Sequence, residues 1–504
     1  MPVDKVLVSN RAALKSKYGT KGLGRIEKAI QALVESDAGR GFETRVLYLD
    51  RASDMKPLEA PRVKKSGDRR QVKQAIDAVY EALEPAYLVL LDAPDVLPHQ
   101  NLKNPVRDED PNVPSDLPYA SSAPYSTNPE DFIAPSRVVS RIPGIRGNGD
   151  PEYLISLLKG AGAWTSLNRK SYESHFAVSA AVWKGSTRKT VTKLFRTTKA
   201  LELSPPDGPR WTKSRLKRRT HFFNLHGALE DENFYGEARG AFPEAHVAPH
   251  LEGRVRAGTL VAAECCYGAE LYDPEAAGLH MGIANTYLGE GASAFFGSTT
   301  VAYGPEDDNA AADVLCQLFV KEVLEGASVG RAALQARQSY VAAQPSLGPI
   351  DLKTLAQFLL LGDASVHPVR RAKKAAPARK ERRAKLSRRA ERLEKTTPRV
   401  ESAAKRGDGA KIRKKIERFA KKHAIQIERT IERFSIRPPG ESRKKSMGGG
   451  GSYLLVYGKS NGALPKRLSK SRRRGKRAIA IRRPVLVVRE EEGKVQEVQK
   501  LVPR

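Results

Sequence analysis

Short apolar runs alternate with longer amphipathic segments along the first 370 residues of the chain. The runs "KVLVS" (5–9), "TRVLYLD" (44–50) and "AYLVLLD" (86–92) are rich in β-branched residues and predict buried strands. Between the first two lies "LGRIEKAIQALVES" (23–36), whose apolar residues recur at helical spacing.

The second half of this region repeats the pattern. "FAVSAAVW", "HFFNLHG" and "TLVAAECC" predict strands, and "ADVLCQLFVKEVLEG" and "GRAALQARQSYVAA" predict helices. "FLLLGDASV" (358–366) predicts a strand that closes the region. Strands that alternate with helices indicate an α/β fold with a mostly parallel sheet flanked by helices. Residues 101–150 interrupt the alternation with a segment dense in Pro, Ser and Asp, and a loop of that length is usually functional or disordered.

Charge divides the chain at about residue 370. From residue 371 to 504 there are 43 Lys and Arg residues against 13 Asp and Glu, a net charge of +30, whereas the whole chain carries +31. The chain is long enough for two or three domains at about 150 residues each. We therefore expect a nearly neutral body over 1–370, with an N-terminal part to about residue 160 and a second part over 161–370.

The basic extension shows two kinds of pattern. Residues 371–447 predict a highly basic helical segment with an apolar stripe at three- and four-residue spacing. Its members are Ile412, Ile416, Phe419, His423, Ile427, Ile431 and Phe434. Residues 448–504 begin with the linker "GGGG" (448–451) and continue with β-like runs, which predicts a small basic β-rich tail.

The cysteine count and the N-terminus bear on location. Three cysteines cannot form a disulfide framework, which favours a reducing compartment. The N-terminal residues do not have the pattern of a signal peptide, and no run of about 18 apolar residues predicts a membrane span. We expect a soluble cytoplasmic protein.

Two strand ends carry residues suited to nucleophilic catalysis. His226 and Gly227 follow one predicted strand, and Cys265 and Cys266 follow the next. A thiolate attacks acyl carbons, and a nearby imidazole accepts and returns the proton. Carboxyl ends of parallel strands meet at one edge of a sheet, so the two groups can lie close together. Glycine after the histidine allows a sharp turn and an N–H group directed at an oxyanion.

These features, in order, resemble the caspase–legumain–gingipain clan of cysteine peptidases. The gingipain branch and the related CHAT domains are similar in "VLVSNRAALKSKYG", "YLVLLDAPDVLP", "VPSDLPYA" and "PSRVVSRIPG". The similarity continues in "YLGEGASAFFGSTTVAYGP" and "FLLLGDASV", so it covers most of residues 1–370. It implies a caspase-like fold and a His–Cys dyad, with His226 as general base and Gly227 near the oxyanion. The basic extension has no recognised counterpart.

Several assignments stay open at this point. Aligning the end of this strand with the E-A-C ending of the family favours Cys266 as nucleophile. Aligning the following glycine with the C-x-x-G form common among gingipains and legumains selects Cys265 instead. Glu264 lies in the substrate pocket, as its equivalent does in related peptidases, or accepts backbone hydrogen bonds. Asp116 lines the cleft or caps a turn. Cys316, within an apolar helix, is interpreted as core.

The resemblance has two limits. In arginine-specific gingipains an acidic residue beyond the strand preceding the histidine strand binds the basic side chain of the substrate. The corresponding residues 184–203 are strongly basic and hold only Glu202, so a preference for Arg or Lys does not carry over. The family's secretion signals are also missing from the sequence, which favours an intracellular regulatory role.

The sequence therefore predicts an intracellular cysteine-type endopeptidase that acts on a protein or peptide substrate and needs no cofactor and no metal. The alternative is a catalytically silent, peptidase-like scaffold. In either case residues 371–504 carry enough charge to bind nucleic acid or another polyanion by counterion release.

Overall fold

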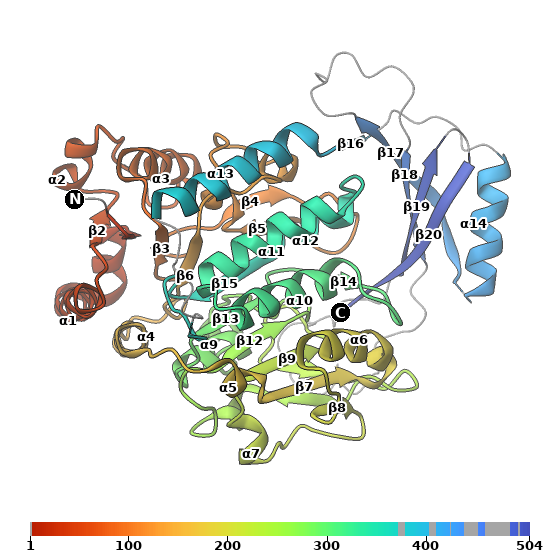
Figure 1. The fold of residues 1–504 in the computed structure, drawn as a ribbon, viewed down its shortest axis with the longest axis horizontal. Helices are drawn as coiled ribbons and strands as arrows, with labels where there is room; N and C mark the ends of the chain where they lie inside the picture. The colour runs from red at the N-terminus through yellow and green to blue at the C-terminus, as the bar shows by residue number, and fades with distance from the viewer. Residues whose placement is uncertain are drawn as a thin grey trace.

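The computed structural model describes residues 3–370, 379–402, 410–423, 425–437, 452–458, 484–491 and 494–504. A ten-stranded sheet forms the centre of the body (Figure 1). Its strands, in spatial order, are β2 (Thr44–Tyr48), β1 (Lys5–Ser9), β3 (Tyr87–Leu91), β6 (Val139–Ile142), β15 (Phe358–Gly362), β13 (Ala294–Ser298), β12 (Leu260–Ala263), β9 (Thr220–Asn224), β7 (His175–Ala180) and β8 (Leu201–Ser204).

Every neighbouring pair in this sheet is parallel except β13 and β15, which run antiparallel. The sheet therefore consists of two parallel halves of opposite direction that meet between β15 and β13. β15 comes from the "FLLLG" run and inserts at the centre of the sheet. The predicted α/β fold with a mostly parallel sheet is confirmed.

Helices cover both faces of the sheet, as buried parallel strands require. On the half that contains β12, alternate residues point to opposite sides. Leu260 and Ala262 join the core under α6 (Lys184–Phe195), α10 (Ala311–Leu324), α11 (Val329–Ala343) and α12 (Pro349–Gln357), whereas Val261 and Ala263 pack on the side of α9 (Ile283–Gly289). On the other half, α1 (Arg11–Gly39) and α4 (Glu152–Ala163) pack on one face and α3 (Arg69–Leu83) on the other.

The main helices have the following bounds: α1 (Arg11–Gly39), α3 (Arg69–Leu83), α4 (Glu152–Ala163), α6 (Lys184–Phe195), α9 (Ile283–Gly289), α10 (Ala311–Leu324), α11 (Val329–Ala343) and α12 (Pro349–Gln357). Shorter helices are α2 (Ala52–Met55), α5 (Arg169–Glu173), α7 (Lys213–Leu216) and α8 (Pro274–Ala277). No helix in the described ranges combines the length and the apolar composition that a bilayer crossing requires.

Residues 101–150 are ordered rather than a bare loop. They form a hairpin of β4 (Gln100–Lys103) and β5 (Asn112–Ser115), two short 3₁₀ helices, and β6. The turn of the hairpin is fixed by buried charge, because Lys353 of α12 donates to Asp108 and to Asp110 (2.6 Å). The polar composition of this segment thus serves internal ion pairs.

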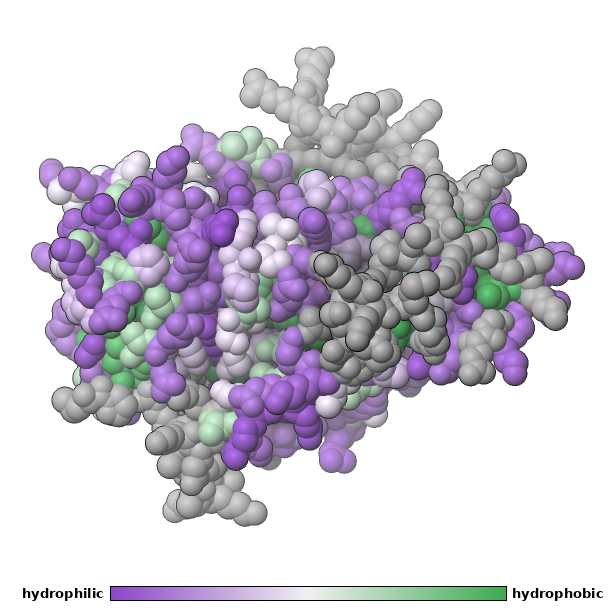
Figure 2. Space-filling view, turned by 90° about the horizontal axis from the view of Figure 1, so that it is seen from above, coloured by the Kyte–Doolittle hydropathy of each residue, from purple (hydrophilic) through white to green (hydrophobic). Residues whose placement is uncertain are grey.

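The basic extension contributes a second sheet and two helices. The sheet has the order β14 (Tyr303–Gly304), β20 (Lys494–Pro503), β19 (Val485–Glu491), β18 (Ser452–Gly458), β17 (Ile427–Arg437) and β16 (Arg399–Ser402). Helix α13 (Arg379–Thr396) packs on α11 of the body, where Gln338 donates to the carbonyl oxygen of Leu386 (3.2 Å). Seen from above, this side of the molecule is mostly hydrophilic (Figure 2).

The predicted apolar stripe from Ile412 to Phe434 is wrong as a single helix. Helix α14 (Ala410–Lys422) buries Ile412 and Ile416 against the small sheet, but Ile427, Ile431 and Phe434 belong to strand β17. The segment 371–447 is therefore not wholly helical. The glycine linker at 448–451 lies outside the described residues.

Candidate active site

The two predicted catalytic strand ends lie side by side. β9 and β12 are parallel neighbours in which Phe223 aligns with Ala263, a register offset of forty residues. The same offset places His226 level with Cys266 just beyond the strands. The backbone N–H of Glu264 still donates to the carbonyl oxygen of Phe223 (2.9 Å), so the pairing extends past the last ladder residue.

Gly227 lies directly against the backbone of Cys266. A Cβ atom built at position 227 would come within 1.8 Å of the Cys266 carbonyl oxygen and 2.9 Å of its carbonyl carbon. Only glycine fits this approach. The close contact holds the histidine turn and the cysteine turn together.

His226 is buried and bound by a carboxylate that the sequence analysis did not single out. Its Nε2 lies 2.8 Å from Oε2 of Glu237, a side chain that is also buried. The imidazole packs between Trp183 (ring centroids 4.3 Å apart) and Phe242 (5.1 Å). The carboxylate and the rings fix the orientation of the imidazole, which is the role of the third member in catalytic triads. Glu237 follows His226 by eleven residues, beyond strand β10 (Asn233–Tyr235), so no short motif announces it.

The two adjacent cysteines point to opposite sides of the sheet. Cys265 packs with Phe223 and Ala263 in the core on the α9 side, and its Sγ lies 3.9 Å from the carbonyl oxygen of Phe223. Cys266 belongs to the other side, where its Sγ accepts from the N–H of Ala302 (3.2 Å). Burial raises the pKa of the Cys266 thiol to about 12, and it raises the pKa of Cys265 as well.

The hairpin of residues 100–115 supports the turn after Cys266. Tyr267 has a left-handed backbone (φ 54°), and its hydroxyl donates to Oδ1 of Asp110 (2.8 Å). Oδ2 of Asp110 accepts from the N–H of Val301 (2.9 Å). One carboxylate thus ties together the two loops on either side of the Cys266 thiol. Strained backbone of this kind persists where the surrounding contacts hold it.

The end of strand β20 lies beside Cys266. The N–H of Cys266 donates to the carbonyl oxygen of Arg504 (3.1 Å), and the N–H of Arg504 donates to the carbonyl oxygen of Ala302 (2.9 Å). In Figure 1 the C label, which marks this end of the chain, lies close to β14, α10 and α6. A peptide segment of the chain itself therefore occupies the position next to the thiol.

The predicted substrate-binding residues fall in different surroundings. Glu264 is buried at the end of β12, near Asp313 and Arg504, and its pKa is raised well above the ordinary value by burial and by the charge of Asp313. Asp116 is held by Arg141 through both carboxylate oxygens (2.7 and 2.9 Å) and by His99 (2.8 Å). These buried partners engage its carboxylate, and a substrate-binding role for Asp116 stays a prediction. Cys316 is a residue of α10 and is buried in the core.

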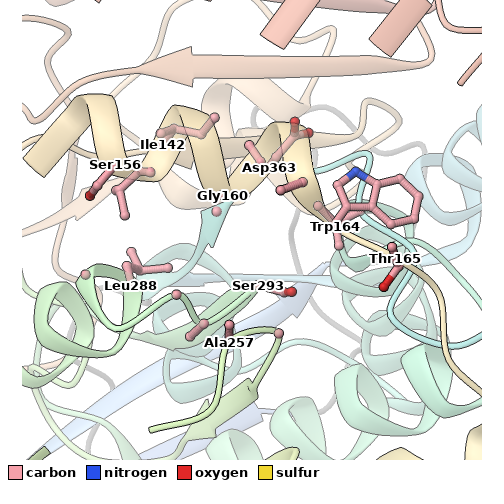
Figure 3. A pocket seen from close by; sticks show the side chains of 18 of the residues that line it. Ile142, Ser156, Gly160, Trp164, Thr165, Ala257, Leu288, Ser293 and Asp363 are labelled. Carbon is pink, nitrogen blue, oxygen red and sulfur yellow. The ribbon is translucent and has the colours of Figure 1, made fainter. Parts of the chain in front are cut away.

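A cavity of about 280 Å³ lies at the other edge of the sheet (Figure 3). It is lined by Ser156 and Trp164 around the end of α4, and by Ala257 and Ser293, which precede β12 and β13. Cys266 follows β12, so this cavity is separate from the cysteine. Asp363 on its wall is already paired with Lys5 (2.7 Å). In the part of the chain that the structure describes, no three His, Cys, Asp or Glu side chains gather as a metal site would require.

Comparison with solved structures gives a consistent likeness. The structure is similar to gingipain R. The match to the Arg-specific cysteine proteinase gingipain R (RgpB) has 11% identity and a TM-score of 0.49, and covers 99% of this chain and 97% of the other. The complex of the pro- and mature domains of Porphyromonas gingivalis RgpB matches with 10% identity and a TM-score of 0.48, covering 99% of each chain.

A more distant match is the Saccharomyces cerevisiae separase–securin complex, at 12% identity and a TM-score of 0.28 over 46% of this chain and 14% of that chain. No family model matches the sequence, and no curated protein matches it.

Proposed function

We propose that the chain is a cysteine-type endopeptidase with Cys266 as nucleophile and His226 as general base. The observation that carries the proposal is the N–H of Cys266, which donates to the carbonyl oxygen of a peptide segment beside the thiol (3.1 Å). An N–H in this position would stabilise the oxyanion of a tetrahedral intermediate. The matching register of His226 and Cys266 and the contact at Gly227 support the same assignment.

The reaction is acyl transfer in two steps. His226 accepts the thiol proton, and the Cys266 sulfur attacks the carbonyl carbon of the peptide bond. The C–N bond then breaks, and the leaving amine takes the proton from the imidazolium. Water, deprotonated by His226, attacks the thioester, and the thiol and a free carboxylic acid result. Glu237 holds Nε2 of His226, so the proton passes through the other ring nitrogen, Nδ1. Gly227 N–H is the proposed second oxyanion donor.

Cys265 is the weaker candidate for the nucleophile. Its side chain points into the core on the α9 side, and the peptide segment contacts Cys266 and Ala302 instead. Three free cysteines fit a reducing, intracellular location for the enzyme.

Labelling with thiol-directed acyloxymethyl ketone peptides, followed by intact mass, tests this proposal. Because residues 494–504 lie beside Cys266 in the wild type, all proteins carry Arg504→Ala, either alone or together with Cys266→Ala, Cys265→Ala or His226→Ala. We expect a single adduct that disappears with Cys266→Ala and His226→Ala and persists with Cys265→Ala. Loss with Cys265→Ala alone would move the nucleophile by one residue, and absence of any adduct would favour the silent scaffold.

Binding of a polyanion by the extension is a second candidate function. The outer face of α14 exposes six cationic side chains, while its apolar residues face the small sheet. These are Arg413, Lys414, Lys415, Arg418, Lys421 and Lys422. Binding to a nucleic acid duplex should weaken steeply with salt, and charge reversal at Lys414 and Lys415 should reduce the salt slope. Equal binding by the wild type and this variant at low salt would exclude α14 as the binding face.

A further inference from the structure

Strand β20 reaches Cys266 as an added strand. Its last residues extend past β19 and pair antiparallel with β14, which body residues form, with Tyr303 opposite Pro503 and Gly304 opposite Val502. Arg504 continues this line through its hydrogen bonds with Ala302 and Cys266. Main-chain pairing to a strand edge is how many proteins bind extended peptides, while pockets beneath the strand select side chains.

The side chain of Arg504 fills such a pocket completely. It is fully buried, and its Nη2 donates to Oδ1 of Asp313 (2.8 Å) and to the carbonyl oxygen of Pro305 (2.6 Å). The guanidinium lies 4.4 Å from the ring centroid of Trp183, a cation–π contact. An anion, a carbonyl oxygen and an aromatic face together match the charge and the flat shape of a guanidinium. The hydrogen bonds all come from Nη2, whereas Nε and Nη1 are buried without a partner among the described residues.

The walls of this pocket are specialised in two further ways. Glu264 places a second buried carboxyl group beside Asp313 and Arg504, and burial together with the neighbouring Asp313 raises its pKa well above the ordinary value. Gly304 leaves room for the side chain, because a Cβ atom there would lie 2.5 Å from Nε and Nη2 of Arg504. The arginine pocket, defined as Trp183, Glu264, Gly304, Pro305 and Asp313, therefore combines negative charge with a gap of the right width.

We propose that the arginine pocket selects arginine as the residue on the acyl side of the cleaved bond, and that residues 494–504 are its internal ligand. In this state the carbonyl group of Arg504 accepts from the N–H of Cys266, the position that a substrate carbonyl would take, so a substrate can bind only after β20 has left this site. The proposal rests on the proposed peptidase function and adds its substrate class and its regulation. The acid that confers the preference is Asp313 at the start of α10, so the lack of an acidic residue other than Glu202 in 184–203 does not oppose it.

Helix α10 itself prepares Asp313 for this role. Oδ2 of Asp313 accepts from the N–H of Ala310 (3.3 Å), while Ser186 of α6 donates to Oδ1 (3.1 Å). The carboxylate lies in the first turn of the helix, where the helix dipole favours negative charge. Its position is thus set by the fold rather than by the bound arginine.

Peptide binding to full-length protein tests the proposal without turnover. All proteins carry Cys266→Ala, and fluorescence anisotropy follows a labelled peptide, Gln-Lys-Leu-Val-Pro-Arg. Arg504→Ala is the opened variant, and Lys500→Ala is the matched control, because Lys500 lies on the same strand and pairs outside the pocket with Glu306 (3.0 Å).

In the control the peptide must displace Arg504 from its buried charge pair, whereas in the opened variant it need not. Losing such a pair costs about 2 kcal/mol or more, and 1.4 kcal/mol is tenfold in affinity. We therefore expect the opened variant to bind the peptide at least about 30-fold more tightly than the control. A peptide with citrulline, the neutral isostere, in place of arginine should bind the opened variant at least about 30-fold more weakly. Equal affinities of the two variants would overturn the claim that residues 494–504 are an internal ligand. Equal affinities of the two peptides would overturn the claim that the pocket selects arginine.

Asp313→Asn tests the role of Asp313 in the arginine pocket. If this variant does not fold, the citrulline peptide still tests the pocket. The outcomes separate the two proposals. Arginine-selective binding without any labelling of Cys266 would leave the pocket intact and remove the peptidase, whereas labelling without preference for arginine would do the reverse.

Discussion

The cleft depends on single residues at the ends of β9 and β12. His226 and Cys266 meet there because a forty-residue register offset continues beyond the paired positions. Their identities could be predicted from the sequence, since polar residues after buried strands follow a general rule of parallel sheets. The supporting residues could not. Glu237, Asp313 and Arg504 lie on other elements, and local patterns hold no information on which side chains the fold brings together.

Gly227 offers a sharp test at this scale. In Gly227→Ala the new Cβ would overlap the carbonyl group of Cys266, so the two turns must separate. We expect probe labelling of Cys266 to fall at least about 100-fold, the usual cost of losing an oriented catalytic group. Gly24→Ala in α1, where a Cβ meets nothing within 4 Å, is the matched control. Unchanged labelling in Gly227→Ala would contradict the close-contact geometry.

The thiol of Cys266 gives a prediction for pH. Burial raises its pKa to about 12, so the thiolate is scarce at neutral pH and increases as pH rises toward that value. Alkylation of Cys266 by iodoacetamide in the wild type should therefore rise about tenfold per pH unit between pH 7 and 10. Arg504→Ala should react faster at pH 7, because solvent then reaches the sulfur. If the alkylation rate of the wild type no longer rose with pH below pH 8, the thiol could not be buried and protonated as described.

At the scale of elements, the strands and helices of the body follow from apolar periodicity, but the extension shows its limit. Residues 427–437 place isoleucines at both helical and strand-compatible spacings, and pairing with β16 and β18 decides for the strand. A single amphipathic helix could not have covered the sheet and supplied its fifth strand. The difference arises from tertiary pairing, which periodicity alone does not report.

Helix α14 should be held by its buried isoleucine. Ile416 is fully buried between α14 and the small sheet, whereas Lys415 is exposed. Ile416→Ala should destabilise the small sheet by about 2–5 kcal/mol, the range for large buried aliphatic residues. Lys415→Ala should stay within about 0.5 kcal/mol of the wild type. Chemical denaturation followed by hydrogen exchange of β18 and β19 measures both, and equal effects would contradict the packing of α14.

At the scale of the whole molecule, the extension and the body are joined by β20, by α13 and by polar contacts, and buried apolar residues of the extension share a core with the body. These residues are Leu393, Val400, Tyr453, Leu455, Tyr457, Val485 and Leu501. The hydroxyl of Tyr457 in β18 accepts from the N–H of Arg107 in the hairpin (2.9 Å), and Tyr453 contacts Ser346 (3.0 Å). The hairpin that contains Arg107 also holds Tyr267 beside Cys266. The small sheet is thus positioned to deliver its last strand to the cleft, an arrangement that charge and composition did not suggest.

Hydrogen exchange should detect this connection. In Arg504→Ala the pairing between β20 and β14 loses its buried anchor, so we expect amide exchange at Tyr303 and Gly304 to accelerate at least about tenfold. Exchange in β18 and β19 should change little, because their ladder does not involve Arg504. Faster exchange across the entire small sheet would instead show that Arg504 stabilises the extension as a whole.

Hydrolysis by the opened protein tests the central claim most directly. A reporter peptide library that varies the residue before the cleaved bond is incubated with Arg504→Ala, with Arg504→Ala/Cys266→Ala and with Arg504→Ala/Cys265→Ala. The account predicts cleavage after arginine by the first and third proteins and none by the second. Absence of cleavage by all three, or cleavage that survives Cys266→Ala, would contradict a peptidase built on His226 and Cys266.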